Sequence, residues 1–214
     1  MPSSVTEVFA GAGLSPAGVV PWNQMVPEAG PGIYAVALTV DTNSMKAALD
    51  DCPVSETSVR DLLNIRPELR LDGQRPSVRE LRKRLAGLWL PDETVLYIGL
   101  AGTSLRQRVG SFYTTPLGAR RPHAGGWPLK TLRLLPSLFV HYAACSNPAA
   151  AEQAMLIAFV DGVSASSRAG LHDQDMPIPF ANLERRKGQR KRHGITGARA
   201  PRIAVMPASD TPIG

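Results

Sequence analysis

The spacing of apolar and polar positions along the chain predicts short strands interrupted by amphipathic helices. A first strand is expected over residues 32–40, where β-branched and aromatic residues follow a Pro-Gly turn signal, and a second over residues 94–99. A third is expected over residues 138–144. Between the first two, leucine and valine recur at helical spacing over residues 55–65 and 77–89, which predicts two helices with serine or threonine N-caps.

Two more helices are expected after the second strand. One covers residues 105–113, and a longer one runs from Asn147, as N-cap, through Pro148 at the first helical position to about residue 160. Together these elements predict an α/β (α+β) fold. We expect a small, mostly antiparallel sheet of about three strands flanked by helices, with a helical insertion over residues 44–92 between the first two strands.

Glycine and proline divide the chain into three expected regions. Residues 1–30 are punctuated too often for long regular elements and are expected to form an N-terminal arm. Residues 31–184 form the main domain, and residues 185–214 form a basic C-terminal segment. A chain of 214 residues can bury one substantial core, which favours a single domain with extensions.

The net charge of +6 favours a polyanionic partner, either nucleic acid or an anionic membrane surface. No stretch is apolar for long enough to span a membrane, and the first residues lack the pattern of a secretion signal. We therefore expect a cytoplasmic protein without membrane association. Cys52 and Cys145 are far apart and match no metal-ligand spacing, so both are expected to be reduced and buried.

Positive charge is densest near the end of the chain. Seven cations fall within residues 185–199, and six of them are candidate DNA-binding residues: Arg185, Arg186, Lys187, Arg190, Lys191 and Arg192. A solvated basic tail is the alternative. Phosphate contacts position a protein without reading sequence. The arginine-rich helical insertion either contacts DNA as well or only covers the sheet, and the sequence does not separate these two roles.

The tripeptides Gly32-Ile33-Tyr34 and Tyr97-Ile98-Gly99 each lie in an expected strand. In this order, followed by an arginine on a helix and a single glutamate on a later helix, they resemble the GIY-YIG nuclease family. The resemblance covers residues 31–40 and 94–182. It implies that Tyr34, Tyr97, Arg108 and Glu152 form the catalytic site, with Arg106 as the alternative arginine.

The chain departs from the family pattern in two places. The signatures usually lie about a dozen residues apart, whereas here residues 53–91 are inserted between them. Such an excursion is tolerable because the entropy of loop closure grows slowly with length. Family members also commonly carry a histidine or tyrosine one turn after the arginine, where this chain has Phe112. The candidate auxiliary residues are Tyr113, His123 and, near the domain end, Asn182.

The resemblance implies a chemistry that these residue types can perform. Glu152 would hold one divalent ion, Mg²⁺ or Mn²⁺ (magnesium or manganese), and the ion would polarise the phosphate. Arg108 would clamp the phosphate through its planar fork. Tyr34, assisted by Tyr97, would take the proton from water. Because burial alone raises the pKa of a phenol, the metal-water network or Arg108 is expected to favour the Tyr34 phenolate.

Each candidate also has an ordinary structural role. The tyrosines can pack in a sheet, Arg108 can be a solvated helix residue, and Glu152 can be a surface acid near a helix N-terminus. His123 can hydrogen-bond within its loop, and Asn182 can form a turn. Only their combination in one order favours the nuclease.

The expected function is therefore divalent-metal-dependent hydrolysis of DNA phosphodiester bonds by an endonuclease, in restriction or defence or in DNA repair. RNA remains open as a substrate. The alternatives are a non-catalytic nucleic-acid-binding protein that retains the nuclease fold, and a base-excising enzyme that uses the same cleft. The sequence does not specify the oligomeric state.

Overall fold

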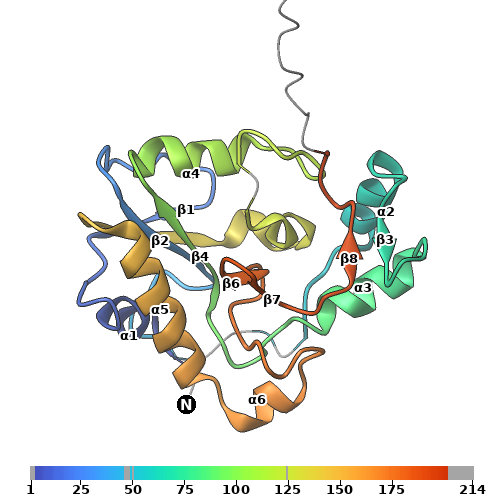
Figure 1. Ribbon diagram of the computed structural model, residues 1–214. Coiled ribbons are helices and arrows are strands. Elements are labelled where there is room, and N and C mark those ends of the chain that lie inside the picture. Colours follow the sequence, from blue (N-terminus) through green and yellow to red (C-terminus); the bar gives the residue numbers. More distant parts are fainter. Residues whose placement is uncertain (1–2, 46–48, 50, 124, 202–214) are drawn as a thin grey trace, which may run out of the picture.

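The computed structural model describes residues 3–45, 49, 51–123 and 125–201. A mixed α/β fold is built on an antiparallel sheet of four strands in the order β1-β5-β2-β4 (Figure 1). The strands are β1 (Gly18–Pro21), β2 (Gly32–Ala37), β4 (Val95–Ala101) and β5 (Phe139–Ala144). The central strand β2 pairs with β4 on one side and with β5 on the other, and all six of its residues are buried.

The sheet has one more strand than the sequence predicted. The fourth strand, β1, lies within residues 1–30, which were expected to be an arm, and pairs with β5 from Gly18↔Tyr142 to Pro21↔Phe139. A strand of four residues that begins with a glycine and ends with a proline is too short to display alternation, so this edge strand depends on its partner. The same region contains α1 (Val5–Ala10), whose N-terminus is capped by Ser4 and Glu7 in a capping box.

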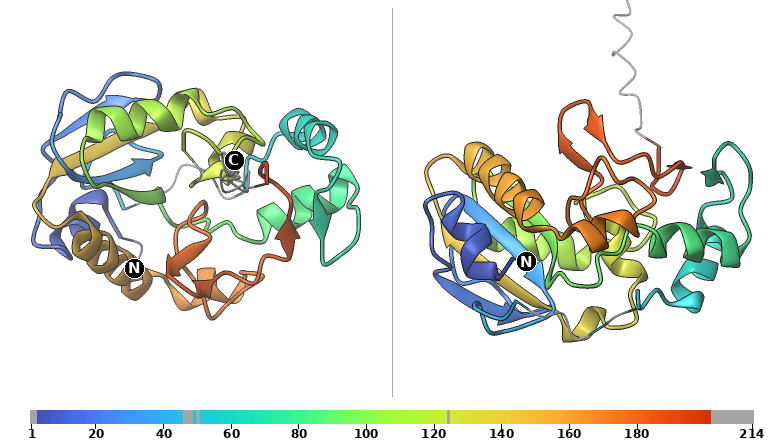
Figure 2. Two further views of the ribbon diagram at one scale, coloured as in Figure 1. Left: turned by 45° about the horizontal axis from the view of Figure 1, so that its top comes forward. Right: turned by 90° about the horizontal axis from the view of Figure 1, so that it is seen from below.

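Side chains of β2 alternate between two cores on opposite faces of the sheet. Ile33 and Ala35 face a core closed by α1 and by α5 (Pro148–Gly162). Tyr34 and Val36 face the larger core, which also contains residues of α4 (Leu105–Thr114) and of the helical insertion. Figure 2 shows α4 and α5 on different sides of the sheet. The tyrosines of both signatures belong to the larger core.

The helical insertion forms as predicted, and its two helices are α2 (Glu56–Ile65) and α3 (Val78–Ala86). Ser55 and Ser77 cap them, and their apolar faces join the core that contains Tyr34. Between them lies β3 (Arg70–Leu71), which pairs with β8 (Ile195–Thr196) from the C-terminal segment. The long excursion therefore returns the chain so that β2 and β4 are direct neighbours.

The last third of the chain is more ordered than its loop-like sequence predicted. It contains α6 (Ala165–Ala169) and a hairpin of β6 (Glu184–Arg186) and β7 (Gln189–Arg190). Two short 3₁₀ helices, η1 (Trp127–Thr131) and η2 (Leu135–Ser137), precede β5. The expected C-terminal segment, residues 185–214, is described only to residue 201.

Two smaller expectations concern cysteines and membranes. Cys52 and Cys145 are both free, as predicted, but each is half-buried where full burial was expected. Every helix in the described part of the chain is too short or too polar to span a lipid bilayer.

Candidate functional site

The two signature tyrosines lie side by side on one face of the sheet. Their ring centroids are 5.9 Å apart, and Tyr34 is paired across the ladder with Gly99. A Cβ atom on Gly99 would lie 2.7 Å from the Tyr34 hydroxyl and 2.7 Å from a ring carbon of Tyr97. Because real Cβ atoms do not approach so closely, only glycine leaves room for both phenols.

The glycine of the first signature has a similar steric role. A Cβ on Gly32 would collide with the carbonyl oxygen of Ala143 in β5 and would lie 2.6 Å from the side chain of Leu105 in α4. Packing of the sheet and of α4 therefore requires this glycine, whatever chemistry the site performs.

His123 approaches the tyrosines from the loop after α4. Its Nε2 lies 3.2 Å from the Tyr34 hydroxyl, and its Nδ1 lies 3.2 Å from the carbonyl oxygen of Gly125. Because a carbonyl can only accept, the proton belongs on Nδ1, so the hydroxyl donates to Nε2. Burial, followed by the charge of Arg108, lowers the pKa of His123 to about 3. The imidazole is therefore neutral, and its Nε2 accepts the hydrogen bond of the Tyr34 hydroxyl.

Phe112, one helical turn after Arg108, contacts His123. The two rings stack at a centroid distance of 4.4 Å and an interplanar angle of 17°. Thr115 adds a hydrogen bond of 2.9 Å from the His123 backbone N–H to its hydroxyl. The phenyl ring and the loop thus bring an imidazole to the tyrosines from another part of the sequence.

Arg108 is the arginine that lies near these groups. Its positive charge acts to lower the pKa values of Tyr34, Tyr97 and Glu152, against the larger upward effect of burial. It also lowers the pKa of His123, in the same direction as burial. Its Nε is buried and has no hydrogen-bond partner in the described part of the chain. Arg106, the alternative, is exposed and donates to the carbonyl of Pro27. Among the two arginines, only Arg108 offers an unsatisfied donor beside the tyrosines.

Glu152, on the first turns of α5, lines a cavity of about 180 Å³ together with Tyr97 and Asn182. Burial raises the pKa of its carboxyl to about 7, and the charge of Arg108 opposes the rise. Within the described ranges, no donor hydrogen-bonds to this carboxylate. Glu184, at the start of β6, lines the same cavity. Sequence analysis missed this second acid because it lies in a basic run with no motif around it.

The pKa values of the phenols correct one expectation. Burial raises the pKa of Tyr34 well above its ordinary value and raises that of Tyr97 to about 12, and Arg108 only partly opposes these shifts. Arg108 therefore favours the Tyr34 phenolate, as expected, but its charge alone does not outweigh desolvation of the anion. Tyr34 is fully buried, whereas Tyr97 is 7% exposed and lines the cavity.

Asn182 connects the end of the domain to the second signature. Its side-chain oxygen accepts from the backbone N–H of Ile98 at 2.9 Å, and its amide donates to the carbonyl of Ile98 at 2.8 Å. Both polar atoms of this buried amide are thereby used in positioning the cavity wall. Tyr113, by contrast, packs its ring against Trp22, and its buried hydroxyl has no partner in the described region.

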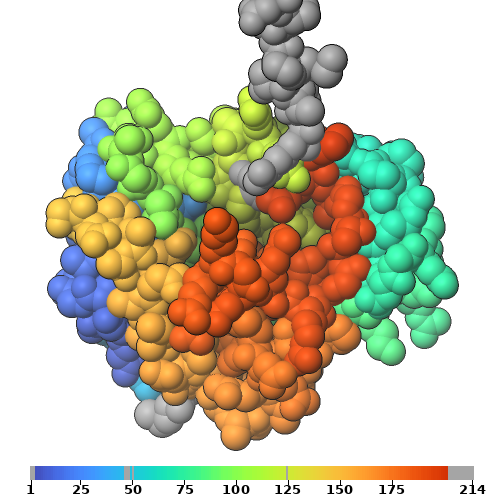
Figure 3. Space-filling model, in the orientation of Figure 1, coloured from blue at the N-terminus to red at the C-terminus, as the bar shows by residue number. Residues whose placement is uncertain are grey.

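The six candidate DNA-binding residues divide into two groups. Arg185, Arg186, Lys187 and Arg190 lie on or beside the β6–β7 hairpin. The chain around this hairpin forms the orange-red surface at the centre of Figure 3. Lys191 is only 4% exposed and donates to the carbonyls of Pro179 and Phe180, while Arg192 pairs with Asp173 and Asp175. The last two therefore have structural partners, but only Lys191 is buried, because the Arg192 side chain is 69% exposed.

The residues of the cavity suit a hard divalent cation. Glu152 and Glu184 offer carboxylate oxygens, and Tyr97 adds a hydroxyl. Mg²⁺ typically takes one or two carboxylates and keeps several waters, so a small oxygen set suffices. Across the described residues, no cluster of three or more histidine, cysteine or acidic side chains is arranged to hold a metal ion, and Arg190 and Arg199 also line this cavity.

No protein-family model, no curated protein and no solved structure matches this chain.

Proposed function

We propose that this protein is a GIY-YIG-type endonuclease that hydrolyses DNA phosphodiester bonds with the help of a divalent cation. One observation carries the proposal: Arg108 lies within electrostatic range of Tyr34, Tyr97 and Glu152. These four residues come from β2, β4, α4 and α5, and the order of their motifs led us to expect them together.

Arg108 binds the scissile phosphate. Its buried Nε has no partner in the described chain, and a phosphate oxygen would satisfy it with a charge-assisted hydrogen bond. Guanidinium donors aimed at a phosphoryl group stabilise the negative charge on its oxygens in the transition state. Lysine would lose the fork geometry, so even this conservative exchange is costly.

Tyr97, Tyr34 and His123 form a path for the proton of the attacking water. Tyr97 faces the cavity, Tyr34 lies behind it and influences the pKa of Tyr97, and the Tyr34 hydroxyl donates to His123 Nε2. For a proton to leave the tyrosines along this path, the pKa of His123, which burial lowers to about 3 with a smaller contribution from Arg108, has to rise when substrate binds. A phosphate bound at Arg108 would offset the positive charge of that arginine, which lowers the pKa of His123. The pKa of the imidazole would then rise, and the ring would accept a proton more readily.

Glu152 would hold the cation, and Glu184 is a second carboxylate within the same cavity. When bound, the ion supplies charge neutralisation at the phosphate and at the leaving oxygen. The carboxyl of Glu152 has its pKa raised to about 7, so a cation would also stabilise its charged form.

The proposal is tested by nicking of supercoiled plasmid DNA in the presence of Mg²⁺ or Mn²⁺. We expect Glu152→Gln to abolish cleavage and Arg108→Lys to reduce it about 100-fold or more. Arg106→Lys, on the same helix, is the matched control and should cleave at the wild-type rate. DNA binding without strand breaks would instead identify a binding protein, and breaks that appear only after alkali would identify base excision.

A further inference from the structure

A second cavity, of about 340 Å³, adjoins the one that contains Glu152. The two share Trp127, Leu183, Arg190 and Arg199, so they are adjacent parts of one groove. We call the second cavity the cationic pocket. Its remaining walls come from the loop before η1 and from the chain leading through β8: Arg120, Lys191, His193, Gly194, Ile195, Thr196, Gly197 and Ala198.

The described residues that line the cationic pocket include three arginines and a lysine but no aspartate or glutamate. This composition separates it from another cavity, of about 600 Å³ beside α3, where Asp72 and Glu80 lie among the cations. The pKa of His193 is a second sign of positive potential. Burial, and then the charges of Arg190, Lys191, Arg84 and Arg199, lower it to about 4. An anion is therefore the ligand that this pocket would attract.

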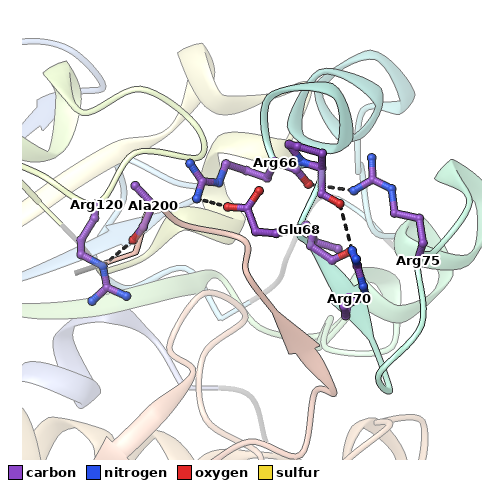
Figure 4. Close-up of polar contacts among 8 residues, drawn as sticks. Arg66, Glu68, Arg70, Arg75, Arg120 and Ala200 are labelled. Carbon is purple, nitrogen blue, oxygen red and sulfur yellow. Dashed lines mark hydrogen bonds and ion pairs between the residues drawn. The ribbon is translucent and has the colours of Figure 1, made fainter. Parts of the chain in front are cut away.

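One arginine is positioned for such a ligand. The Nε of Arg120 donates to the carbonyl of Ala200 at 2.7 Å, which Figure 4 shows. Its two terminal nitrogens donate no hydrogen bond within the described part of the chain. A guanidinium held through Nε keeps a free edge that matches a phosphate.

The size and walls of the pocket restrict the class of ligand. A volume of about 340 Å³ is near the lower limit of ligand pockets, so it holds about one nucleotide and excludes a duplex. Trp127, Ile195 and Ala198 give it apolar walls that can contact a base or sugar. The backbone of this wall turns sharply at Gly194 and Gly197, which have positive φ angles of 66° and 69°. The wall is also held to the helical insertion, because β8 pairs with β3.

We infer that the cationic pocket binds the sugar-phosphate backbone of a single nucleic-acid strand next to the scissile bond. The preferred substrate then carries a single-stranded segment, such as a flap, overhang or branch, beside the site of cleavage. This inference rests on the proposed nuclease function, and it names the structure of the substrate rather than its sequence.

Binding without metal tests the inference separately from cleavage. Fluorescence anisotropy in EDTA compares a labelled single-stranded oligonucleotide with a blunt duplex of equal length, in full-length wild type, Arg190→Gln and Arg120→Gln. The control is Arg133→Gln, an exposed arginine outside both cavities that removes the same charge. We expect the single strand to bind at least 10-fold more tightly than the duplex.

Each pocket variant should weaken single-strand affinity about 5-fold or more and reduce the slope of log K against log salt by about 0.7, whereas Arg133→Gln should change affinity less than 2-fold. Equal affinity for the two oligonucleotides, or equal losses in pocket and control variants, would overturn the inference. Single-strand preference without cleavage in Mg²⁺ would leave the pocket established and refute the nuclease. Cleavage of duplex DNA at a rate that Arg190→Gln does not change would support the nuclease function and refute the role of the cationic pocket.

Discussion

The tyrosine face of the sheet and the described part of the C-terminal segment, residues 185–201, hold their polar groups in different ways. On the sheet, Tyr34, Tyr97 and His123 are buried in the larger core and packed ring against ring. In the C-terminal segment, pairing is limited to short strands, and polar bonds from residues such as Lys191 connect it to the domain. The first region has little freedom to rearrange because close packing opposes displacement, whereas the second presents charge to a ligand.

This contrast predicts that substitutions on the tyrosine face affect catalysis and folding strongly, whereas single charge removals in the C-terminal segment have graded effects on binding.

The largest effect is expected for Tyr34→Phe. The substitution keeps the ring in the core but removes the hydroxyl that donates to His123, which interrupts the proton path. We expect plasmid nicking to slow about 100- to 1,000-fold, within the range of general acid-base effects. Tyr142→Phe in β5, the neighbouring strand, makes the same change outside the path and should cleave at the wild-type rate.

Adding a second substitution sharpens this result. If Tyr34 and His123 act as one path, Tyr34→Phe combined with His123→Phe should be hardly slower than either single variant. Multiplicative losses would show that the two residues act independently.

Gly99→Ala should destabilise the fold by about 2 kcal/mol. The new methyl group would press on the rings of Tyr34 and Tyr97, and overpacking of a buried cluster costs about 1 to 3 kcal/mol. Urea unfolding followed by circular dichroism measures the loss. Gly102→Ala, three residues further on, has no atom within 4 Å of the new Cβ and serves as the control. Equal stability of both variants would contradict the close packing of the phenols.

Lys191 should make stability depend on pH. Burial lowers its pKa in the folded protein to about 7, from an ordinary value of 10.5. Between pH 7 and pH 10.5 Lys191 binds more protons in the unfolded chain than in the folded protein. The free energy of unfolding therefore rises as the pH increases from about 7 to 10.5. We expect a gain of about 1 to 2 kcal/mol between pH 7 and pH 10, because water entry and relaxation reduce the cost of a buried charge.

Lys191→Met should remove that part of the rise. The comparison is made as the difference between wild type and variant, since Lys130, with its pKa lowered to about 8 by burial, contributes in the same direction in both proteins. Parallel curves of unfolding free energy against pH would show that Lys191 keeps its proton in the fold.

The smallest effect is expected at the tip of the β6–β7 hairpin. Lys187→Gln removes one exposed cation from a flexible side chain, so DNA affinity should fall less than about 3-fold, with a slightly shallower salt dependence. Anisotropy titrations at two salt concentrations measure it. A loss as large as that of Arg190→Gln would mean that the hairpin tip, rather than the cationic pocket, dominates binding.

Local patterns in the chain were sufficient to predict most helices and three of the four strands of the main sheet. The serine caps and leucine spacing of α2 and α3, and the Asn147-Pro148 start of α5, act over a few residues and are readable without tertiary contacts. The short edge strand β1 was missed because its hydrogen bonds are supplied by β5, which lies over one hundred residues away.

The candidate site was predictable only as far as its motifs. Tyr34 and Tyr97 could be found because each lies in a short signature within a strand, and Glu152 because it is the single glutamate of an apolar helix. Glu184 and the cationic pocket have no such local signal. They arise where β6, η1 and the chain around β8 meet, and this meeting depends on long-range packing.

The sequence alone determined the identity and order of the groups to which we assign the proposed chemistry. It also determined most of the helices and strands that carry them, because capping, periodicity and turn chemistry are local. Only the tertiary structure decided which arginine lies beside the tyrosines, that His123 rather than Tyr113 accepts from Tyr34, and which cations remain accessible. Those choices depend on burial and on distances between remote segments, and burial sets both the protonation state of a group and its access to a ligand.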